Sequence, residues 1–307
     1  MEQLIRARNR IPVIQQEQAG DVDYLTFPIL SAQPGIVHAF STRRGGVSEG
    51  IYASMNLSFT RGDDTENVQE NYRRMAQVLH MDVSQMVCTY QTHTTNIRRV
   101  QREDGGKGIL FERGYTDVDG LVTDEKDLCL VCFFADCVPL YFVDTEQGAI
   151  GLAHSGWRGT VNGMGRCMVE RMRREFGTRP EHLLVAIGPS ICQDCYEISE
   201  EVAEAFRQME ANLEHRDRLL NELQEKSAYP QGHILKQGRE AGKYQLDLWL
   251  ANLLILQEAG VPLSNIQVTD VCTCCNSEYL FSHRASQGKR GNLAAFLMQT
   301  HTGKQNP

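Results

Sequence analysis

Residues 128–159 read LCLVCFFADCVPLYFVDTEQGAIGLAHSGWRG, and this stretch decides the fold that the sequence predicts. It contains three short apolar runs separated by turn-forming residues. Runs of this length, with β-branched and aromatic side chains among them, are typical of strands buried on both faces. They predict strands at residues 128–134, 140–143 and 149–153. Because the connections between them are short, we expect these strands to pair in a hairpin-like arrangement.

Two reactive side chains stand at the ends of these strands. The first strand leads into Ala135, Asp136 and Cys137, and the third strand ends on His154. Buried strands form a rigid scaffold, and functional residues commonly follow directly after such strands. We therefore expect the functional site to include the Cys137 thiol and the His154 imidazole.

The rest of the chain mixes helices and strands without strict alternation. Helical patterning is present at residues 64–79, 161–176, 199–226 and 244–257. Further strands are predicted at residues 12–14, 24–29, 36–41, 56–59, 86–90, 97–100, 183–187, 266–269, 279–282 and 294–298. This order predicts an α/β (α+β) fold with mixed sheets in layers. No linker is visible, so we expect one domain over residues 1–307. Residues 1–30 would be an N-terminal extension of strands, and residues 212–242 a surface excursion.

The composition is that of a globular protein, with 41% hydrophobic and 23% charged residues. The net charge of −8 gives no general attraction to nucleic acid. No run approaches the roughly 20 apolar residues that span a bilayer, and the N-terminal residues do not resemble a signal peptide. We therefore expect a cytoplasmic protein without membrane or nucleic-acid partners. Its ten cysteines are then expected to be reduced thiols rather than disulfides.

Three side chains form a candidate metal site, namely His93, Cys137 and His154. Each follows or ends an apolar strand, although the long spacing between them forms no short motif. Two imidazoles and a thiolate suit zinc or another borderline-soft ion, and three protein ligands leave a fourth position open. The alternative is that each is a structural residue, a hydrogen-bonded histidine or a packed cysteine at a strand end.

The same atoms permit a reaction without metal. Cys137 would then be a nucleophile and His154 its base, with Asp136 or Asp119 orienting the imidazole, as in a cysteine hydrolase or deamidase. A non-catalytic binding module, in which these residues are structural, is a further alternative.

Two other stretches offer anion-binding residues. Arg44 follows a strand and precedes Gly45 and Gly46, whose backbone amides could face a phosphate. Arg158 lies just before a predicted helix N-terminus, which also favours anions. Neither stretch matches the P-loop or the dinucleotide-binding pattern, and a solvated turn is the alternative for both.

A second group of cysteines lies in CQDC and CTCC, and its members are Cys192, Cys195, Cys272, Cys274 and Cys275. Two close cysteine pairs can form a structural zinc site. The usual spacing has two residues between the members of each pair, whereas only Thr273 separates Cys272 from Cys274. Thiols that simply pack at strand ends are the alternative.

Nine blocks of the sequence together resemble a known family over about residues 36–298. They are HAFSTRRGGVS, NLSFTRGDD, QTHT, DVDGLVTDE, ADCVPLYFVD, GLAHSGWRGT, IGPSICQDCYEI, DLWLANLLILQEAGV and FSHRASQGKRGN. In this order they resemble the YfiH-like family, called multicopper polyphenol oxidoreductase or laccase-domain proteins and described as purine nucleoside phosphorylases. The resemblance implies the layered α/β sandwich shared with cysteine-dependent deamidase toxins. It also implies a metal site at His93, Cys137 and His154.

The resemblance implies phosphorolysis of adenosine, inosine and S-methyl-5′-thioadenosine, together with adenosine deamination. The older activity of the family, copper-dependent oxidation of phenols, needs several copper centres and many histidines. This chain has nine histidines, of which only His93 and His154 stand in site-like contexts. We therefore expect one zinc ion as cofactor, with copper as the alternative, and purine nucleosides and phosphate as substrates.

Particular residues can be assigned to this chemistry as expectations. Asp136 is a candidate base for deamination, since no H-x-E motif is present. Arg44 is the first candidate for holding phosphate, with Ser41 and His38 as neighbours and Arg158 as a weaker candidate. The family often carries arginines where this chain has Ala285 and Asn292, and these departures would weaken or rearrange phosphate binding.

Overall fold

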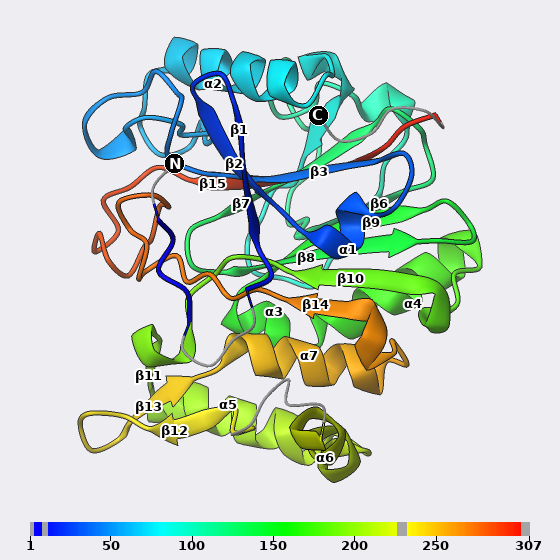
Figure 1. Cartoon of the computed structure of the whole chain (residues 1–307), viewed down its shortest axis with the longest axis vertical. Coiled ribbons are helices and arrows are strands. Elements are labelled where there is room, and N and C mark those ends of the chain that lie inside the picture. The colour runs from blue at the N-terminus through cyan, green and yellow to red at the C-terminus, as the bar shows by residue number, and fades with distance from the viewer. Residues whose placement is uncertain (1–2, 8–11, 226–231, 302–307) are drawn as a thin grey trace.

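Two six-stranded sheets stack face to face, and helices cover both outer faces of the stack (Figure 1). The structure is a computed structural model that describes residues 3–7, 12–225 and 232–301. The mixed α+β architecture predicted from the sequence is confirmed. Within the described ranges, no helix has the length and apolar character needed to cross a membrane.

The first sheet is mostly antiparallel. Its strands in spatial order are β1 (Gln15–Ala19), β2 (Val22–Thr26), β3 (Ile36–Ser41), β15 (Leu293–Gln299), β7 (Cys129–Phe134) and β4 (Met86–Cys88). Only β4 and β7 pair in parallel. The central pair places Leu297 of β15 opposite Leu130 of β7. Strand β15 therefore brings the C-terminal part of the chain into the middle of this sheet.

The second sheet contains the other two strands of the opening stretch. Its order is β14 (Ile266–Val268), β10 (Leu183–Ile187), β8 (Val138–Asp144), β9 (Ile150–Ser155), β6 (Gly120–Thr123) and β5 (Ile97–Arg99). Strands β8 and β9 pair antiparallel, as predicted. The predicted pairing of β7 with β8 is wrong, because the chain crosses from one sheet to the other between them. Asp136 lies at this crossing with a φ of 89°, in the left-handed region.

The core between the sheets follows from the alternation of side chains along the central strands. Leu130, Cys132 and Phe134 of β7 point toward the second sheet, where they pack with Tyr141 and Leu152. The intervening residues of β7 point to the opposite face, toward α2. Both faces of β7 are thus covered, which explains its continuous apolar sequence.

Helices and a small sheet form the outer layers (Figure 1). The first sheet is covered by α2 (Thr65–Val78), and the second by α4 (Met164–Phe176) and α7 (Leu248–Glu258). Beyond α7 lie α5 (Glu200–Ala211), α6 (Arg216–Glu225) and a sheet of order β11 (Glu197–Ser199), β13 (Lys243–Leu246), β12 (Leu235–Gln237). The remaining helices are α1 (Pro28–Ser31), α3 (Trp157–Val161), η1 (Gly50–Tyr52), η2 (Val83–Gln85), η3 (Arg102–Asp104), η4 (Pro180–His182), η5 (Gln193–Cys195) and η6 (Leu263–Asn265).

Several predicted elements differ from the structure. Residues 12–14, 56–59 and 279–282 are not strands, and the start of the helix predicted at 244–257 is strand β13. The helix predicted at 161–176 is interrupted where Gly163 adopts a φ of 74°. The long helix predicted at 199–226 is two helices, and its predicted end at Lys226 lies outside the described residues. Periodicity detected apolar stretches but not these breaks.

The inter-sheet core is expected to dominate stability. Leu297→Ala should lower the free energy of unfolding by about 2–5 kcal/mol, because Leu297 is fully buried between the sheets and truncation leaves a cavity. Leu110→Ala is the matched control, since Leu110 is 49% exposed and should change stability by less than about 0.5 kcal/mol. Denaturant unfolding of both variants measures the difference. Equal losses would contradict the assignment of the core.

Candidate active site

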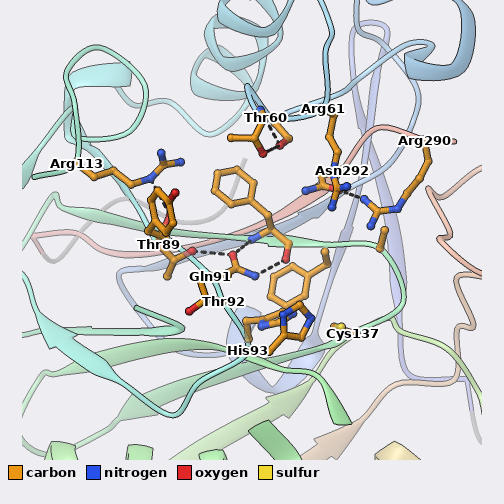
Figure 2. A pocket seen from close by; sticks show the side chains of 16 residues that line it. Thr60, Arg61, Thr89, Gln91, Thr92, His93, Arg113, Cys137, Arg290 and Asn292 are labelled. Atoms are coloured by element: carbon orange, nitrogen blue, oxygen red, sulfur yellow. Dashed lines mark hydrogen bonds between the residues drawn. The ribbon is translucent and has the colours of Figure 1, made fainter. Parts of the chain in front are cut away.

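Three potential metal ligands meet where the two sheets end. The ligand atoms of His93, Cys137 and His154 all lie within 4.8 Å of one another. His154 belongs to β9, Cys137 directly precedes β8, and His93 lies in the loop between β4 and β5 (Figure 2). Pairing of β8 with β9 places Pro139 opposite His154, so the cysteine is held beside the imidazole. The structure thus brings together the three residues that the sequence suggested.

A buried carboxylate fixes the loop that carries His93. Asp119 accepts hydrogen bonds from the backbone amides of Thr92 (3.0 Å), His93 (3.1 Å) and Thr94 (2.9 Å). His93 itself adopts a φ of 66°, a conformation that needs support from its surroundings. Asp119 supplies this support while remaining fully buried.

The same carboxylate orients His154. The Nδ1 atom of His154 donates to Oδ1 of Asp119 at 2.8 Å, which leaves Nε2 as the nitrogen available to Cys137 or to a metal ion. Burial acts to raise the pKa of Asp119, but the hydrogen bond and charge of His154 outweigh it and lower the pKa. Burial acts to lower the pKa of His154, yet the Cys137 thiolate and Asp119 raise it to about 9. Asp119 is thus the partner that fixes the tautomer, as in carboxylate–histidine–metal arrangements.

Charge also stabilises the thiolate form of Cys137. Burial acts to raise the pKa of its thiol, but the charge of His154 and hydrogen bonds from His154 and His93 lower it to about 6. A thiolate with two imidazoles is a donor set that zinc accepts, with one tetrahedral position left for a substrate or water. Gly156 leaves the space for this arrangement, since a Cβ there would lie 3.0 Å from Cys137 Sγ and 3.0 Å from His93 Cδ2. The residues present therefore fit a single zinc ion.

A cavity of about 380 Å³ opens onto these ligands (Figure 2). Besides the three ligands, its lining includes Ser58, Thr60, Arg61, Thr89, Tyr90, Gln91, Thr92, Arg113, Phe133, Phe134, Ala135, Arg290 and Asn292. Gln91 is structural, because its amide bonds both the N–H (2.7 Å) and the C=O (2.8 Å) of Phe133. The exposed ring of Tyr90 and the half-buried ring of Phe133 give the cavity flat apolar surfaces.

Three arginines give this cavity its charge, namely Arg61, Arg113 and Arg290. In the part of the chain that the structure describes, none of them forms a salt bridge with a carboxylate. Arg290 is only 8% exposed, and its Nε is buried without a hydrogen-bond partner. Burial and the charge of Arg61 lower the pKa of Arg290 to about 10, so it remains a cation at neutral pH. Guanidinium groups beside a cavity that lack a carboxylate partner in the described residues are suited to bind an anion.

The predicted phosphate residues on the first sheet lie elsewhere. The side chains of His38 and Ser41 are fully buried in β3, and neither lines the cavity. His38 accepts a hydrogen bond from the Phe27 amide (2.8 Å), and burial lowers its pKa to about 3. Ser41 accepts one from the amide of Ala294 (2.9 Å). Both side chains therefore bind backbone of the fold rather than facing the cavity.

Close packing explains why glycines occupy the loop after β3. Arg44 does not line the cavity. A Cβ on Gly45 would lie 2.4 Å from the carbonyl oxygen of Asp21, and one on Gly46 would lie 2.1 Å from that of Ser54. The Gly46 amide donates to Ser54 Oγ (3.1 Å). The two glycines thus permit close packing of neighbouring backbone.

Arg158 and Asp136 flank the ligands without lining the cavity. The guanidinium group of Arg158 lies over the ring of Trp157, 4.3 Å from its centroid. The carboxylate oxygens of Asp136 accept hydrogen bonds from Thr273 Oγ1 (2.7 Å) and the Arg284 amide (2.6 Å). This geometry favours a role for Asp136 in holding the segment that leads into Cys137, and its role as a base stays a prediction.

Sequence reasoning missed the three cavity arginines. Each is followed by glycine, as Arg44 and Arg158 are, so the same signal is present at five places. Asn292, one of the two departures from the family pattern, lines the cavity and accepts a hydrogen bond from Arg290. Ala285 does not line it.

Comparison with known proteins identifies the family. The family described as multi-copper polyphenol oxidoreductase laccase matches residues 37–300, and the chain belongs to this family. A relative named purine nucleoside phosphorylase YlmD, from Geobacillus stearothermophilus, is 36% identical over 93% of this chain and 96% of its own length. A relative from an unknown prokaryotic organism, named adenosine deaminase RL5, is 34% identical over 81% of this chain and 88% of its own length.

A solved structure shares the fold. The crystal structure of YlmD from Geobacillus stearothermophilus superposes with a TM-score of 0.81 at 35% identity, covering 95% of this chain and all of that one. The layered fold and the family suggested by the sequence are therefore confirmed.

Asp119 provides a direct test of how the site is held. Asp119→Asn should weaken zinc binding about 10–100-fold, because it removes the charge that orients His154 and an acceptor of the His93 loop. Asp117→Asn is the matched control, since Asp117 is exposed and hydrogen-bonds Thr92 Oγ1 in the same turn. Competition with a chromogenic chelator measures both affinities. Equal affinity in the two variants would contradict the role of Asp119.

Proposed function

We propose that this protein is a zinc-dependent purine nucleoside phosphorylase that acts on adenosine, inosine and S-methyl-5′-thioadenosine and also deaminates adenosine. The observation that carries the proposal is that His93, Cys137 and His154 share one cavity with three arginines that have no carboxylate partner in the described chain. The names of the relatives from Geobacillus stearothermophilus and the unknown prokaryote support the two reactions.

Phosphorolysis needs an anion held against the ribose. A phosphate oxygen attacks C1′, the bond to the purine nitrogen breaks, and the purine leaves with the electron pair. Guanidinium groups bind phosphate through charge-assisted hydrogen bonds, and fixing its approach removes part of the entropic barrier. Arg61 and Arg290 line the cavity, and they are our candidates for holding the phosphate.

A site for the purine needs an apolar surface for the flat base and polar groups at one end of the cavity. Tyr90 and Phe133 line the same cavity and offer rings against which a flat base can pack. Zinc held by His93, Cys137 and His154 would supply Lewis-acid stabilisation of developing negative charge or a water of lowered pKa. Deamination adds water at C6 of adenosine and releases ammonia, a reaction that a metal held by these three residues would assist, so one cavity can serve both activities.

Removing one cavity arginine separates phosphate binding from nucleoside binding. Arg61→Ala should raise the phosphate KM about 10–100-fold, because a charge-assisted hydrogen bond contributes about 1.5–3 kcal/mol. The KM for adenosine should change little. Arg174→Ala is the surface control, since its side chain is 68% exposed and Arg174 does not line this cavity. The series should include Arg44→Ala, the candidate from sequence. A large rise in the phosphate KM of Arg44→Ala, without such a rise in Arg61→Ala, would contradict the proposal that phosphate binds in this cavity.

A thiol hydrolase is the second candidate, and one observation favours it. Asp119 accepts a hydrogen bond from His154, whose other ring edge lies beside Cys137, and this order of groups resembles that in cysteine hydrolases. Of the two orienting residues considered, Asp119 is the one hydrogen-bonded to His154, which supports it for that role. A copper oxidase has less support, since no metal-ligating group within residues 3–7, 12–225 and 232–301 contains more than two histidines.

Metal removal distinguishes the candidates. Protein stripped with a chelator should lose formation of adenine and ribose 1-phosphate from adenosine, and stoichiometric zinc should restore it. Chromatography of the products, with and without phosphate, measures both reactions. Phosphorolysis yields adenine and ribose 1-phosphate, whereas deamination yields inosine and ammonia. A stripped protein that keeps its turnover, and loses it on alkylation of Cys137, would establish the thiol hydrolase in its place.

A further inference from the structure

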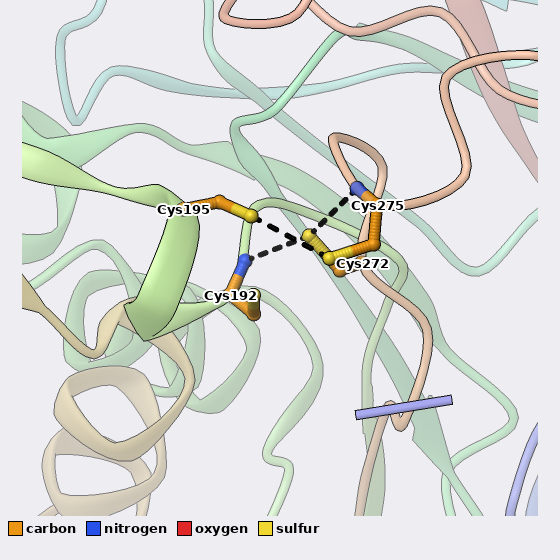
Figure 3. Close-up of side chains that lie close together, drawn as sticks. All are labelled: Cys192, Cys195, Cys272 and Cys275. Carbon is orange, nitrogen blue, oxygen red and sulfur yellow. Dashed lines mark hydrogen bonds between the residues drawn. The ribbon is translucent and has the colours of Figure 1, made fainter. Parts of the chain in front are cut away.

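Four cysteine side chains converge at a second place in the molecule, and they come from the segments that follow β10 and β14 (Figure 3). They are Cys192, Cys195, Cys272 and Cys275, and their sulfur atoms all lie within 4.8 Å of one another. The sulfurs of Cys195 and Cys275 are 3.5 Å apart, too far for a disulfide bond. Cys192 and Cys272 are buried, whereas Cys275 is exposed.

The spacing of these residues is that of a zinc site. Two residues separate Cys192 from Cys195, and two separate Cys272 from Cys275. The pairing predicted from the sequence, Cys272 with Cys274, leaves only one residue between the two cysteines. The structure corrects this pairing, because Cys275 and not Cys274 contributes the fourth sulfur. Paired C-x2-C segments that bring four thiols together are characteristic of closed structural zinc sites.

The backbone also favours thiolates at this place. The amides of Cys192 (3.2 Å) and Cys275 (3.4 Å) both donate to Sγ of Cys272. Four thiols gathered this closely, two of them on buried residues, form a donor set that a soft metal ion satisfies.

We propose that Cys192, Cys195, Cys272 and Cys275 bind a structural zinc ion, distinct from the metal at His93, Cys137 and His154. Four thiolates complete a tetrahedral shell and leave no open position, so this ion stabilises structure and performs no chemistry. Its effect is to clamp the segment after β10 to the segment after β14.

The clamp braces the active site through Thr273. Cys272 forms a bridge with Ser190, and the Thr273 amide donates to the carbonyl of Ser190 (3.1 Å). The hydroxyl of Thr273 donates to Oδ1 of Asp136 (2.7 Å), the residue directly before Cys137. Losing the second zinc should therefore lower thermal stability and loosen the segment that carries the Cys137 ligand.

Matched cysteine variants test this site in the full-length protein. Cys275→Ser should bind about one zinc fewer per chain than Cys274→Ser, and should unfold at a lower temperature, because only Cys275 is a ligand. Mass spectrometry of metals measures the content after purification without chelators. Because both variants keep His93, Cys137 and His154, the difference between them is independent of the proposed function. Equal zinc content in the two variants would overturn the inference, as would iron in place of zinc or an intact mass that shows disulfides.

A second measurement remains informative if Cys275→Ser fails to fold. His93→Ala removes an exposed ligand of the other metal and keeps all four cysteines. X-ray absorption at the zinc edge of this variant should show about four sulfur ligands at about 2.3 Å. A shell containing nitrogen or oxygen ligands, or no bound zinc, would overturn the inference.

Discussion

The buried carboxylate of Asp119 is the contact on which the site depends. It bonds three successive backbone amides of the loop after β4 and the imidazole at the end of β9. That loop follows a strand of the first sheet, whereas β9 belongs to the second. One side chain therefore fixes a left-handed residue, a histidine tautomer and the junction of two layers. A buried charge with fewer partners would be costly, and here every partner is also part of the site.

The stacking of the sheets explains why cations and ligands share a cavity. Cys137 and His154 belong to the second sheet, while Arg290 lies just before β15 of the first and Arg61 just before α2. The cavity lies where the ends of these two layers meet, so each layer contributes one part of the chemistry. The crossing at Asp136 carries the chain between the layers at this same place. The proposed zinc site at Cys192, Cys195, Cys272 and Cys275 would support this crossing, because neighbouring Thr273 hydrogen-bonds Asp136.

Much of the fold follows from the sequence, because apolar runs mark β7, β8, β9 and β15 directly. Their pairing does not, since a run buried on both faces does not reveal which sheet it joins, and β7 was therefore placed beside β8. The three ligands could be grouped because each stands at a strand end. The arginines could not, because Arg61, Arg113 and Arg290 lie in loops without periodicity, and Arg44 carries the same arginine–glycine signal. Cys275 was overlooked because Cys274 lies beside it.

A crystal structure with zinc and phosphate tests the central claim most directly, namely that metal and anion share one cavity. Anomalous scattering at the zinc edge locates the metal, and the remaining density locates the phosphate. The expected result is a zinc ion bound by His93, Cys137 and His154, with phosphate contacting Arg61 or Arg290 in the same cavity. Phosphate bound instead at the loop of Arg44, or no metal at these three ligands, would contradict the claim.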